Sequence, residues 1–316
     1  MNIKLLAPLV LLLLAACEGN PIGTGEPPPP PVPPCTVDCP PVPDNPISPK
    51  VPAITGQNLE ATTFTPGAPT ITIRLRSQDA AALDATYARN ATFDVDGYAA
   101  YTYQETGSNR FVVALVREQG PLKGGIAVDG GQFVNYFGGG TYLRADVFTR
   151  PTGAAAVGAD ANYSGTYVGL WNAGPATPGG PGGDLNPTRS YRIDGRALIT
   201  ADFTDMSVSG GVDQRRILDA EALTDTGLDA LDRTATNVLL PTIGLKATEI
   251  TDIGSFVSKV VIGTAEVGDY SGIFGPNAQQ VAALAIFQPV NIPQLKEHGL
   301  IVLPSCATGG GPACSP

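Results

Sequence analysis

Few residues of this chain have the chemistry of a hydrolase. His298 is the only histidine, so a serine or cysteine nucleophile activated by an imidazole would have to use it. It lies in a proline-punctuated segment near the end of the sequence, where we expect a solvent-exposed loop residue. The sequence contains no G-x-S-x-G nucleophile elbow and no phosphate-binding glycine loop. These observations argue against hydrolysis by a histidine-dependent mechanism.

One tripeptide, Asp225-Thr226-Gly227, matches the loop in which aspartic proteases hold a catalytic carboxylate. That mechanism requires two carboxylates that share a proton, and therefore a second copy of the loop or a homodimer. No second copy occurs, and the flanking residues are acidic and helix-favouring where a hydrophobic strand would be needed. We therefore predict no catalytic residues and no enzyme activity.

Cys17 offers the clearest chemistry, because it closes the sequence LAAC after an apolar run that begins at Leu5. Leucine, two small residues and cysteine form the lipobox of a lipoprotein signal, and the run is too short to span a bilayer. We predict that residues 1–16 are a signal peptide and that Cys17 is lipidated. Several acyl chains on one residue give a stable membrane anchor. Glu18, in place of aspartate, permits export to the outer membrane.

The other four cysteines form two close pairs, Cys35 with Cys39 and Cys306 with Cys314. A zinc site would need four ligands, and the only histidine is far in sequence from Cys35 and Cys39. We therefore expect disulfides, no metal and no cofactor. Short-range bridges within each pair are the simplest pairing, and a cross-pairing that ties the two ends of the chain together stays open. Either arrangement implies an oxidising compartment.

Proline dominates the segment after Cys17. Fourteen of the 30 prolines lie between Pro21 and Pro52, with almost no large apolar residue among them. This composition is typical of a polyproline II spacer, and at about 3.1 Å per residue roughly thirty residues reach on the order of 90 Å. Residues 17–53 are therefore predicted to be a linker that holds a folded domain away from a lipid surface.

The rest of the chain has the composition of folded domains. Hydrophobic residues make up 43% and charged residues 15% of the sequence, so a well-filled core is expected. The formal net charge is −10. This charge argues against nucleic-acid binding and against electrostatic attachment to anionic lipid. It suits a basic partner, but an acidic surface also serves solubility alone.

Strand patterns fill residues 54–151. Residues 70–76 alternate apolar and polar side chains, and further strands are expected at 93–103, 110–117, 125–137 and 141–148. The only helix expected in this region covers residues 80–89. Tyrosines in and beside these strands serve either as interface contacts or, more commonly, as sheet packing; they are Tyr98, Tyr101, Tyr103, Tyr136 and Tyr142.

A second set of strands is expected at 163–171, 192–203, 206–212, 238–248, 256–267, 269–274 and 281–287, with a helix-favouring surface connection at 217–233. The stretch 268–287 organises this region. Tyr270, Gly272 and Phe274 alternate with other residues as in a strand, and the glycine leaves room for a neighbouring ring. Gly275-Pro276 then ends the strand, because proline suits the first position of a helical turn.

The order of these features resembles the β-barrel domain of transferrin-binding-protein-B-like surface lipoproteins, a family that includes factor-H-binding-protein-like barrels. The motif G-x-Y/F-x-G-x-F/Y-x-G-P-x-A of that family is matched, with minor spacing slack, at Gly268, Tyr270, Gly272, Phe274, Gly275, Pro276 and Ala278. The family's A-D-F…V-S-G hairpin resembles Ala201-Asp202-Phe203 followed by Val208-Ser209-Gly210, and its first barrel strand resembles the run that contains Tyr163 and Gly165. Gln280 and Ala283 depart from the usual glutamate and glycine, so the match concerns the fold more than a binding site.

The resemblance implies an all-β fold. An antiparallel barrel of the eight-stranded type is expected at 159–290, preceded by an antiparallel β subdomain at 54–151 in the position of the family's "handle" and followed by a C-terminal tail at 291–316. The resemblance also implies a lipid-anchored protein at the cell surface that binds an extracellular or host protein, with iron acquisition as one such role. Two alternatives stay open, namely binding of haem or another apolar small molecule, and a structural envelope lipoprotein.

Overall fold

The computed structural model describes residues 47–65, 67–76, 82–105, 110–129, 137–151, 160–173, 190–219, 233–234, 237–289, 295–308 and 314. All of them belong to one compact unit, Pro43–Pro316. The predictions for the signal peptide, for Cys17, Cys35 and Cys39, for most of the proline-rich linker and for Asp225-Thr226-Gly227 lie outside the described residues. Among those described, no helix is long and apolar enough to cross a membrane.

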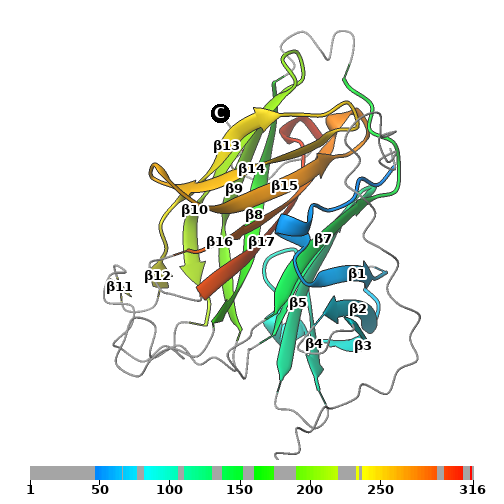
Figure 1. Cartoon of the computed structure of the whole chain (residues 1–316), viewed down its shortest axis with the longest axis vertical. Coiled ribbons are helices and arrows are strands. Elements are labelled where there is room, and N and C mark those ends of the chain that lie inside the picture. The colour runs from blue at the N-terminus through cyan, green and yellow to red at the C-terminus, as the bar shows by residue number, and fades with distance from the viewer. Residues whose placement is uncertain are drawn as a thin grey trace, which may run out of the picture. The chain divides into compact units, whose positions relative to one another are not determined.

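The first sheet is an antiparallel meander of seven strands in chain order (Figure 1). Its strands are β1 (Leu59–Thr63), β2 (Thr70–Arg76), β3 (Ala82–Arg89), β4 (Ala99–Gln104), β5 (Phe111–Gln119), β6 (Leu122–Asp129) and β7 (Gly138–Arg144). Strict alternation in β2 buries Ile71, Ile73 and Leu75 and exposes the residues between them, as the sequence pattern predicts.

This sheet curls until its first and last strands approach each other. The short helix α1 (Ala53–Gly56) precedes β1, and the amide of Asn58 donates to the carbonyl of Gly138 at 3.2 Å. Position 139 must be glycine, because a Cβ there would lie 2.0 Å from the carbonyl oxygen of Gly56. The curl gives the sheet an inner face, lined among others by Ile73, Tyr87 and Val112.

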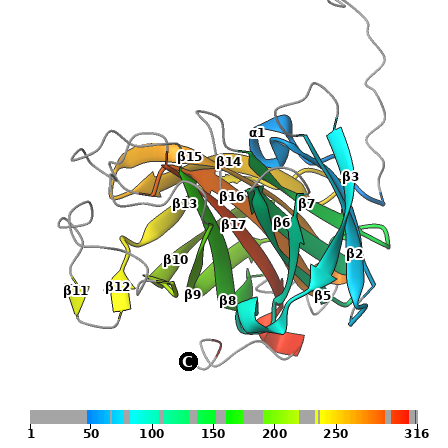
Figure 2. The same ribbon diagram turned by 90° about the horizontal axis from the view of Figure 1, so that it is seen from below.

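The second sheet is a closed antiparallel barrel (Figures 1 and 2). Its eight strands are β8 (Asp160–Ala173), β9 (Tyr191–Asp202), β10 (Ser207–Ile217), β13 (Ile243–Glu249), β14 (Ser255–Ile262), β15 (Ala265–Phe274), β16 (Gln280–Phe287) and β17 (Leu295–Pro304). Pairing of β9 with β10 closes the ring, and the short strands β11 (Arg233–Thr234) and β12 (Asn237–Leu239) extend the edge of β10. The predicted all-β class, with a β subdomain followed by an antiparallel barrel, is confirmed.

The strand that was expected as a helix is β3. Residues 80–89 are rich in alanine and leucine, which favour helices, but residues 82–89 pair with β2 and β4 instead. Pairing buries Ala85 and Tyr87 on one face and exposes the residues between them. Tertiary pairing therefore overrides the local helix propensity.

The C-terminal segment also differs from the prediction. Residues 291–316 were expected to form a tail, yet β17 lies between β16 and β8 and completes the barrel. Residues 300–303 form an unbroken apolar run because this strand is buried on both faces, Ile301 facing the barrel interior and Leu300 facing the first sheet. His298, expected in an exposed loop, is 1% exposed within this strand.

A shared apolar layer joins the two sheets. Leu115 and Ile126 of the first sheet pack in one cluster with Leu284 and Leu300 of the barrel. Hydrogen bonds cross the same layer, because the Tyr98 hydroxyl donates to the carbonyl of Thr166 at 2.9 Å. This layer occupies the outer face of the curled sheet, so the ends of its inner face stay available for a site.

Candidate functional site

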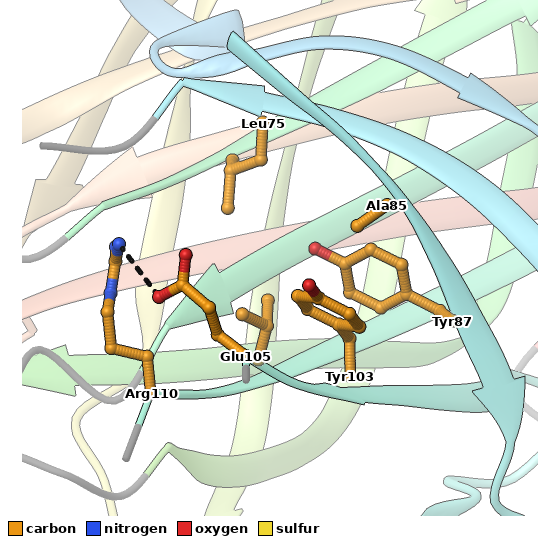
Figure 3. Close-up of a pocket in the computed structure, with 7 residues that line it drawn as sticks. Leu75, Ala85, Tyr87, Tyr103, Glu105 and Arg110 are labelled. Atoms are coloured by element: carbon orange, nitrogen blue, oxygen red, sulfur yellow. Dashed lines mark ion pairs between the residues drawn. The ribbon is translucent and has the colours of Figure 1, made fainter. Parts of the chain in front are cut away.

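A small pocket lies at one end of the inner face of the seven-stranded sheet (Figure 3). Its volume is about 20 Å³, enough for a single water-sized group. The lining combines apolar, aromatic and charged side chains, namely Leu75, Ala85, Tyr87, Tyr103, Glu105, Arg110 and Val112. We call it the Tyr87 pocket.

Strand register brings these residues together. Ala85 and Tyr87 are two residues apart on β3 and therefore share a face, and Tyr103 of β4 pairs with Val112 of β5. The rings of Tyr87 and Tyr103 lie with their centroids 5.3 Å apart. The amide of Glu105 donates to the carbonyl of Arg110 at 3.1 Å, so both residues lie where the β4–β5 pairing ends.

Three charged side chains meet at this end of the sheet. Arg110 bonds to Asp129 through a short charged hydrogen bond and lies 3.6 Å from Glu105. Asp129 is fully buried and also accepts from the amide of Phe137 at 2.7 Å. Burial raises the pKa of Asp129 above its ordinary value, although the bonds from Phe137 and Arg110 oppose this. Two carboxylates against one guanidinium leave a formal charge of −1.

The two tyrosine hydroxyls of the pocket are unpaired as far as the structure describes the chain. Figure 3 shows both of them pointing into the pocket, and neither has a hydrogen-bond partner among the described residues. Tyr87 is only 2% exposed. Burial, followed by the nearby charge of Asp129, raises the pKa of Tyr87 well above its ordinary value, so the hydroxyl stays protonated. The rest of the Tyr87 side chain is buried, so a ligand or a water that pairs with this hydroxyl has to enter the pocket.

The tyrosines that the sequence singled out have different environments. Tyr98 and Tyr101 are buried, with hydroxyls that donate to the carbonyls of Thr166 and Ala68, and the Tyr142 hydroxyl donates to Ser271 at 3.3 Å. These three therefore serve packing, and Tyr136 lies outside the described residues. Only Tyr103 lines the pocket. The sequence reasoning missed Tyr87, Glu105 and Arg110, and only the two-residue alternation of Ala85 and Tyr87 could have indicated the first of them.

The residues that carry the barrel motif form the frame of the barrel. Phe274 lies at the centre of an aromatic cluster, with ring centroids 5.5 Å from Tyr163 and 5.1 Å from Phe203. The Tyr163 hydroxyl donates to the carbonyl of Ala278 at 2.5 Å. Pro276 begins a 3₁₀ turn, Pro276–Ala278, directly after Gly275.

The remaining motif residues allow close approach or end a strand. A Cβ at Gly272 would lie 2.3 Å from the ring of Phe256, and one at Gly268 would lie 2.2 Å from the carbonyl oxygen of Ile286. Gly165 is less confined, because a Cβ there would meet only the end of the Leu303 side chain, at 2.7 Å. Ala201 is buried, and Asp202 accepts from the amide of Thr204 at the end of β9. The Tyr270 hydroxyl donates to the carbonyl of Lys246 at 2.6 Å. None of these contacts leaves a group free for a ligand.

Inside the barrel, Glu297 accepts hydrogen bonds from three residues. The Tyr167 hydroxyl and the Trp171 indole each donate at 2.5 Å, and Arg215 forms a short ion pair with the same carboxylate. Arg215 and Glu297 are both fully buried, and the guanidinium also donates to the carbonyl of Pro241. This network links β8, β10 and β17 across the barrel interior.

His298 points out of the barrel toward the first sheet. A Cβ at Gly138 would lie 2.8 Å from the imidazole ring, so the two sheets meet closely here. Neither ring nitrogen has a hydrogen-bond partner in the described part of the chain. Burial, and then the charge of Lys296, lowers the pKa of His298 from 6.5 to about 3. The imidazole is therefore neutral and enclosed at physiological pH.

A larger cavity of about 290 Å³ lies beside the start of β8 and the end of β17. Its lining includes Asp160, Asn162, Asn277, Gln279 and Cys306. Cys306 and Cys314 are joined by a disulfide, with Cα atoms 5.2 Å apart. Among the described residues, no group of three or more His, Cys, Asp or Glu side chains could hold a metal ion.

No family model and no curated protein matches the sequence. Solved structures of transferrin-binding protein B do match. The intact Ap-TbpB with its N and C lobes has 12% identity and a TM-score of 0.31, over 77% of this chain and 53% of that one. The isotype 1 protein from serogroup B Neisseria meningitidis has 17% identity and a TM-score of 0.32, over 78% and 52%. A double mutant from Haemophilus parasuis Hp5 has 13% identity and a TM-score of 0.32, over 77% and 52%.

The chain thus spans about half the length of these solved structures. Their TM-scores lie below 0.5 and their identities below 25%, so we infer no function from the matches.

Proposed function

We propose that this chain is a surface lipoprotein that binds an extracellular protein partner through the Tyr87 pocket end of its seven-stranded sheet, and that it is not an enzyme. The unpaired Tyr87 hydroxyl carries the proposal. The Tyr87 residue is 2% exposed, and its hydroxyl faces a pocket lined by Glu105 and Arg110. A group that enters this pocket can form a hydrogen bond with the hydroxyl that no described residue forms. That hydrogen bond would contribute to binding.

The dimensions of the pocket favour a protein partner over haem or another apolar molecule. Sites for such ligands are typically about 300–1,000 Å³ and mostly apolar. The Tyr87 pocket is about 20 Å³, which suits one side chain tip. In the barrel interior, large side chains such as Trp171, Arg215 and Phe256 are buried. A protein side chain inserted into the pocket, with the surrounding surface forming the rest of the interface, agrees with these dimensions.

The buried state of His298 supports a non-enzymatic role. A general base must reach the proton that it removes, and this imidazole is enclosed between the two sheets. Glu297 is equally enclosed and already accepts three hydrogen bonds. These two buried groups therefore have structural roles.

The proposed attachment rests on the lipobox. Cys17 would hold the chain in the outer membrane, and residues 17–53 would hold the folded part away from it, at the cell surface. The disulfide Cys306–Cys314 agrees with an oxidising compartment. Replacing the thiol by Cys17→Ser is expected to move the protein from the membrane fraction to the soluble fraction. Retention in the membrane after a carbonate wash would place the anchor elsewhere.

We further propose that residues 54–151 take the place of the family's handle beside a barrel at 159–290, extended by β17. This equivalence is one of position in the chain. The family resemblance makes a host iron carrier one candidate partner and another host protein a second.

Capture on cells tests the binding role. Cells that display the full chain are incubated with serum, washed, and the retained proteins are identified by mass spectrometry. We expect a retained protein that is lost with Glu105→Gln and kept with Lys246→Gln, a control on the outer face of the barrel whose side chain is 58% exposed. Equal retention by both variants, or by cells without the chain, would contradict the proposal.

A further inference from the structure

We propose that the Tyr87 pocket binds the ammonium group of a lysine side chain on the partner. This inference rests on the proposed function, because it names the chemistry that the partner presents. A cluster of acidic residues alone would not indicate a cation site. Here a second observation points to a ligand, because the Tyr87 side chain is 2% exposed overall and its hydroxyl is directed into the pocket, where no described residue pairs with it (Figure 3).

Size restricts the ligand first. A volume of about 20 Å³ accommodates one water-sized group. An ammonium group has nearly that size, whereas a guanidinium, an imidazolium or a phosphate is larger. The walls formed by Leu75, Ala85 and Val112 are apolar and suit the methylene stem of a lysine. A lysine side chain carries its small charged group at the end of an apolar stem. The charged group fits the water-sized space, and the stem fits the apolar walls.

Hydrogen bonding restricts it further. An ammonium has three donors and no acceptor, so it needs oxygen atoms around it. The hydroxyl oxygens of Tyr87 and Tyr103 point into the pocket and can both accept. A carboxylate ligand would instead need donors, and the main donor of the pocket, Arg110, is already engaged by Asp129 and Glu105.

Charge agrees with this assignment. Glu105 and Asp129 against Arg110 leave one formal negative charge, and the chain as a whole carries −10. The ring of Tyr103, which is only partly buried, lies at the same opening. A cation above that ring gains from the negative potential of its face. An anion would meet repulsion from Glu105 and from the chain's net charge.

Tyrosine signals provide a direct test. The mature chain carrying Cys17→Ser is labelled at the ring carbons of its ten tyrosines, and their NMR signals are assigned by single Tyr→Phe variants. The probe is Nα-acetyl-lysine methylamide, and the matched probe is the same molecule acetylated on Nε, which lacks the charge. We expect saturable shifts of the Tyr87 and Tyr103 signals with the charged probe alone. Because one ammonium makes few contacts, the dissociation constant should be on the order of 10 mM.

Variants sharpen the test. Glu105→Gln is expected to weaken binding of the charged probe about fivefold or more, since it removes the formal charge of the pocket. Glu118→Gln removes a carboxylate from β5 outside the pocket and should leave the constant unchanged. Equal shifts with both probes, or shifts confined to other tyrosines, would overturn the lysine assignment and leave a structural water as the occupant.

The two proposals fail separately. If cells retain a partner in a Glu105-dependent manner but the charged probe does not bind, the binding function stands and the lysine assignment is wrong. If the probe binds but no partner is retained, the pocket chemistry stands and the proposed function is wrong.

Discussion

Both sheets of this molecule bury an arginine beside a carboxylate, but they use the pair differently. In the closed barrel, Arg215 and Glu297 are fully buried, and the carboxylate accepts further hydrogen bonds from Tyr167 and Trp171. In the open sheet, Arg110 pairs with the fully buried Asp129, but the Arg110 side chain keeps 9% of its surface exposed and lies 3.6 Å from Glu105, whose side chain is 28% exposed. The first pair is therefore enclosed on all sides by its own barrel. At the second pair, Glu105 and part of Arg110 face the pocket, so similar chemistry is structural in one sheet and available for recognition in the other.

Tyrosine hydroxyls show the same contrast. In the barrel, the hydroxyls of Tyr163, Tyr167 and Tyr270 donate to the Ala278 carbonyl, the Glu297 carboxylate and the Lys246 carbonyl, respectively. In the pocket, those of Tyr87 and Tyr103 donate to no described residue. These three barrel hydroxyls are thus paired within the chain, whereas the two pocket hydroxyls can pair with a ligand.

The largest expected effect comes from breaking the barrel pair. Glu297→Gln leaves the Arg215 guanidinium buried without a counter-charge, and removal of one member of such a pair costs about 3–5 kcal/mol. Urea denaturation followed by circular dichroism measures the loss. In the open sheet, Glu105→Gln removes only the partly exposed contact with Arg110 and keeps Asp129, so it should change the free energy of unfolding by less than about 1 kcal/mol. Similar losses for both variants would remove the distinction between the two sheets.

Overpacking of the barrel should have the next largest effect. A side chain at Gly272 would meet the ring of Phe256 at 2.3 Å and the carbonyl oxygen of Ala282 at 2.6 Å. Gly272→Val is therefore expected to lower stability by about 1–3 kcal/mol, as forced packing does. Thermal denaturation should show a lower Tm, while Val257→Thr, at an exposed position of the neighbouring strand, serves as the control. An unchanged Tm for Gly272→Val would contradict the packing described for this strand.

Acid should weaken the contact between the two sheets through His298. Its pKa is about 3 in the folded protein against an ordinary value of 6.5, so the unfolded chain binds a proton first as the pH falls. The stability that depends on the neutral imidazole is complete above pH 6.5 and declines below it, by about 1.4 kcal/mol per pH unit.

Between pH 7 and pH 5 this decline amounts to about 2 kcal/mol. His298→Leu keeps an apolar contact and removes the titration, so its free energy of unfolding should fall less over that interval. Urea denaturation at both pH values gives the two differences. Parallel pH profiles for the wild type and the variant would show that another group governs acid sensitivity.

The smallest expected effect separates the two kinds of tyrosine. Tyr163→Phe removes a buried hydrogen bond to Ala278 and should cost about 1 kcal/mol. Tyr87→Phe removes a hydroxyl without a described partner, so it should be neutral or slightly stabilising. The two denaturation midpoints in urea give the comparison. A loss for Tyr87→Phe as large as that for Tyr163→Phe would mean that its hydroxyl is already paired.

Much of the fold could be predicted where local patterns and tertiary structure agree. Alternation in residues 70–76 and 269–274 indicates strands, and Gly275-Pro276 indicates the turn after the second of them. The alanine and leucine residues of β3 led to the prediction of a helix, because helix propensity depends on the local sequence whereas strand pairing depends on residues elsewhere in the chain. Pro289 and Pro293 led to the prediction of a C-terminal tail in place of β17. The apolar run at 300–303 is nevertheless typical of a strand buried on both faces.

The pocket could not be predicted in the same way. Tyr87, Tyr103 and Arg110 come from separate strands or their ends, and only the pairing register places them around one point. No local spacing connects them, since register depends on contacts along whole strands. The barrel motif can be recognised in the sequence because its glycines and aromatics are neighbours on one strand. A motif confined to one strand describes the frame of the barrel, whereas the pocket is assembled from several strands.

Strand β17 also determines when the barrel can form. It is the last of the described strands in chain order, yet it pairs with β8, as in Ile301 with Tyr167, and it supplies the carboxylate for Arg215. A ribosome that makes the amino end first releases seven barrel strands before the one that completes the ring. Pairing between distant parts of a chain is slow to form. The ring therefore closes only after β17 has been made, when it pairs with β16 and β8.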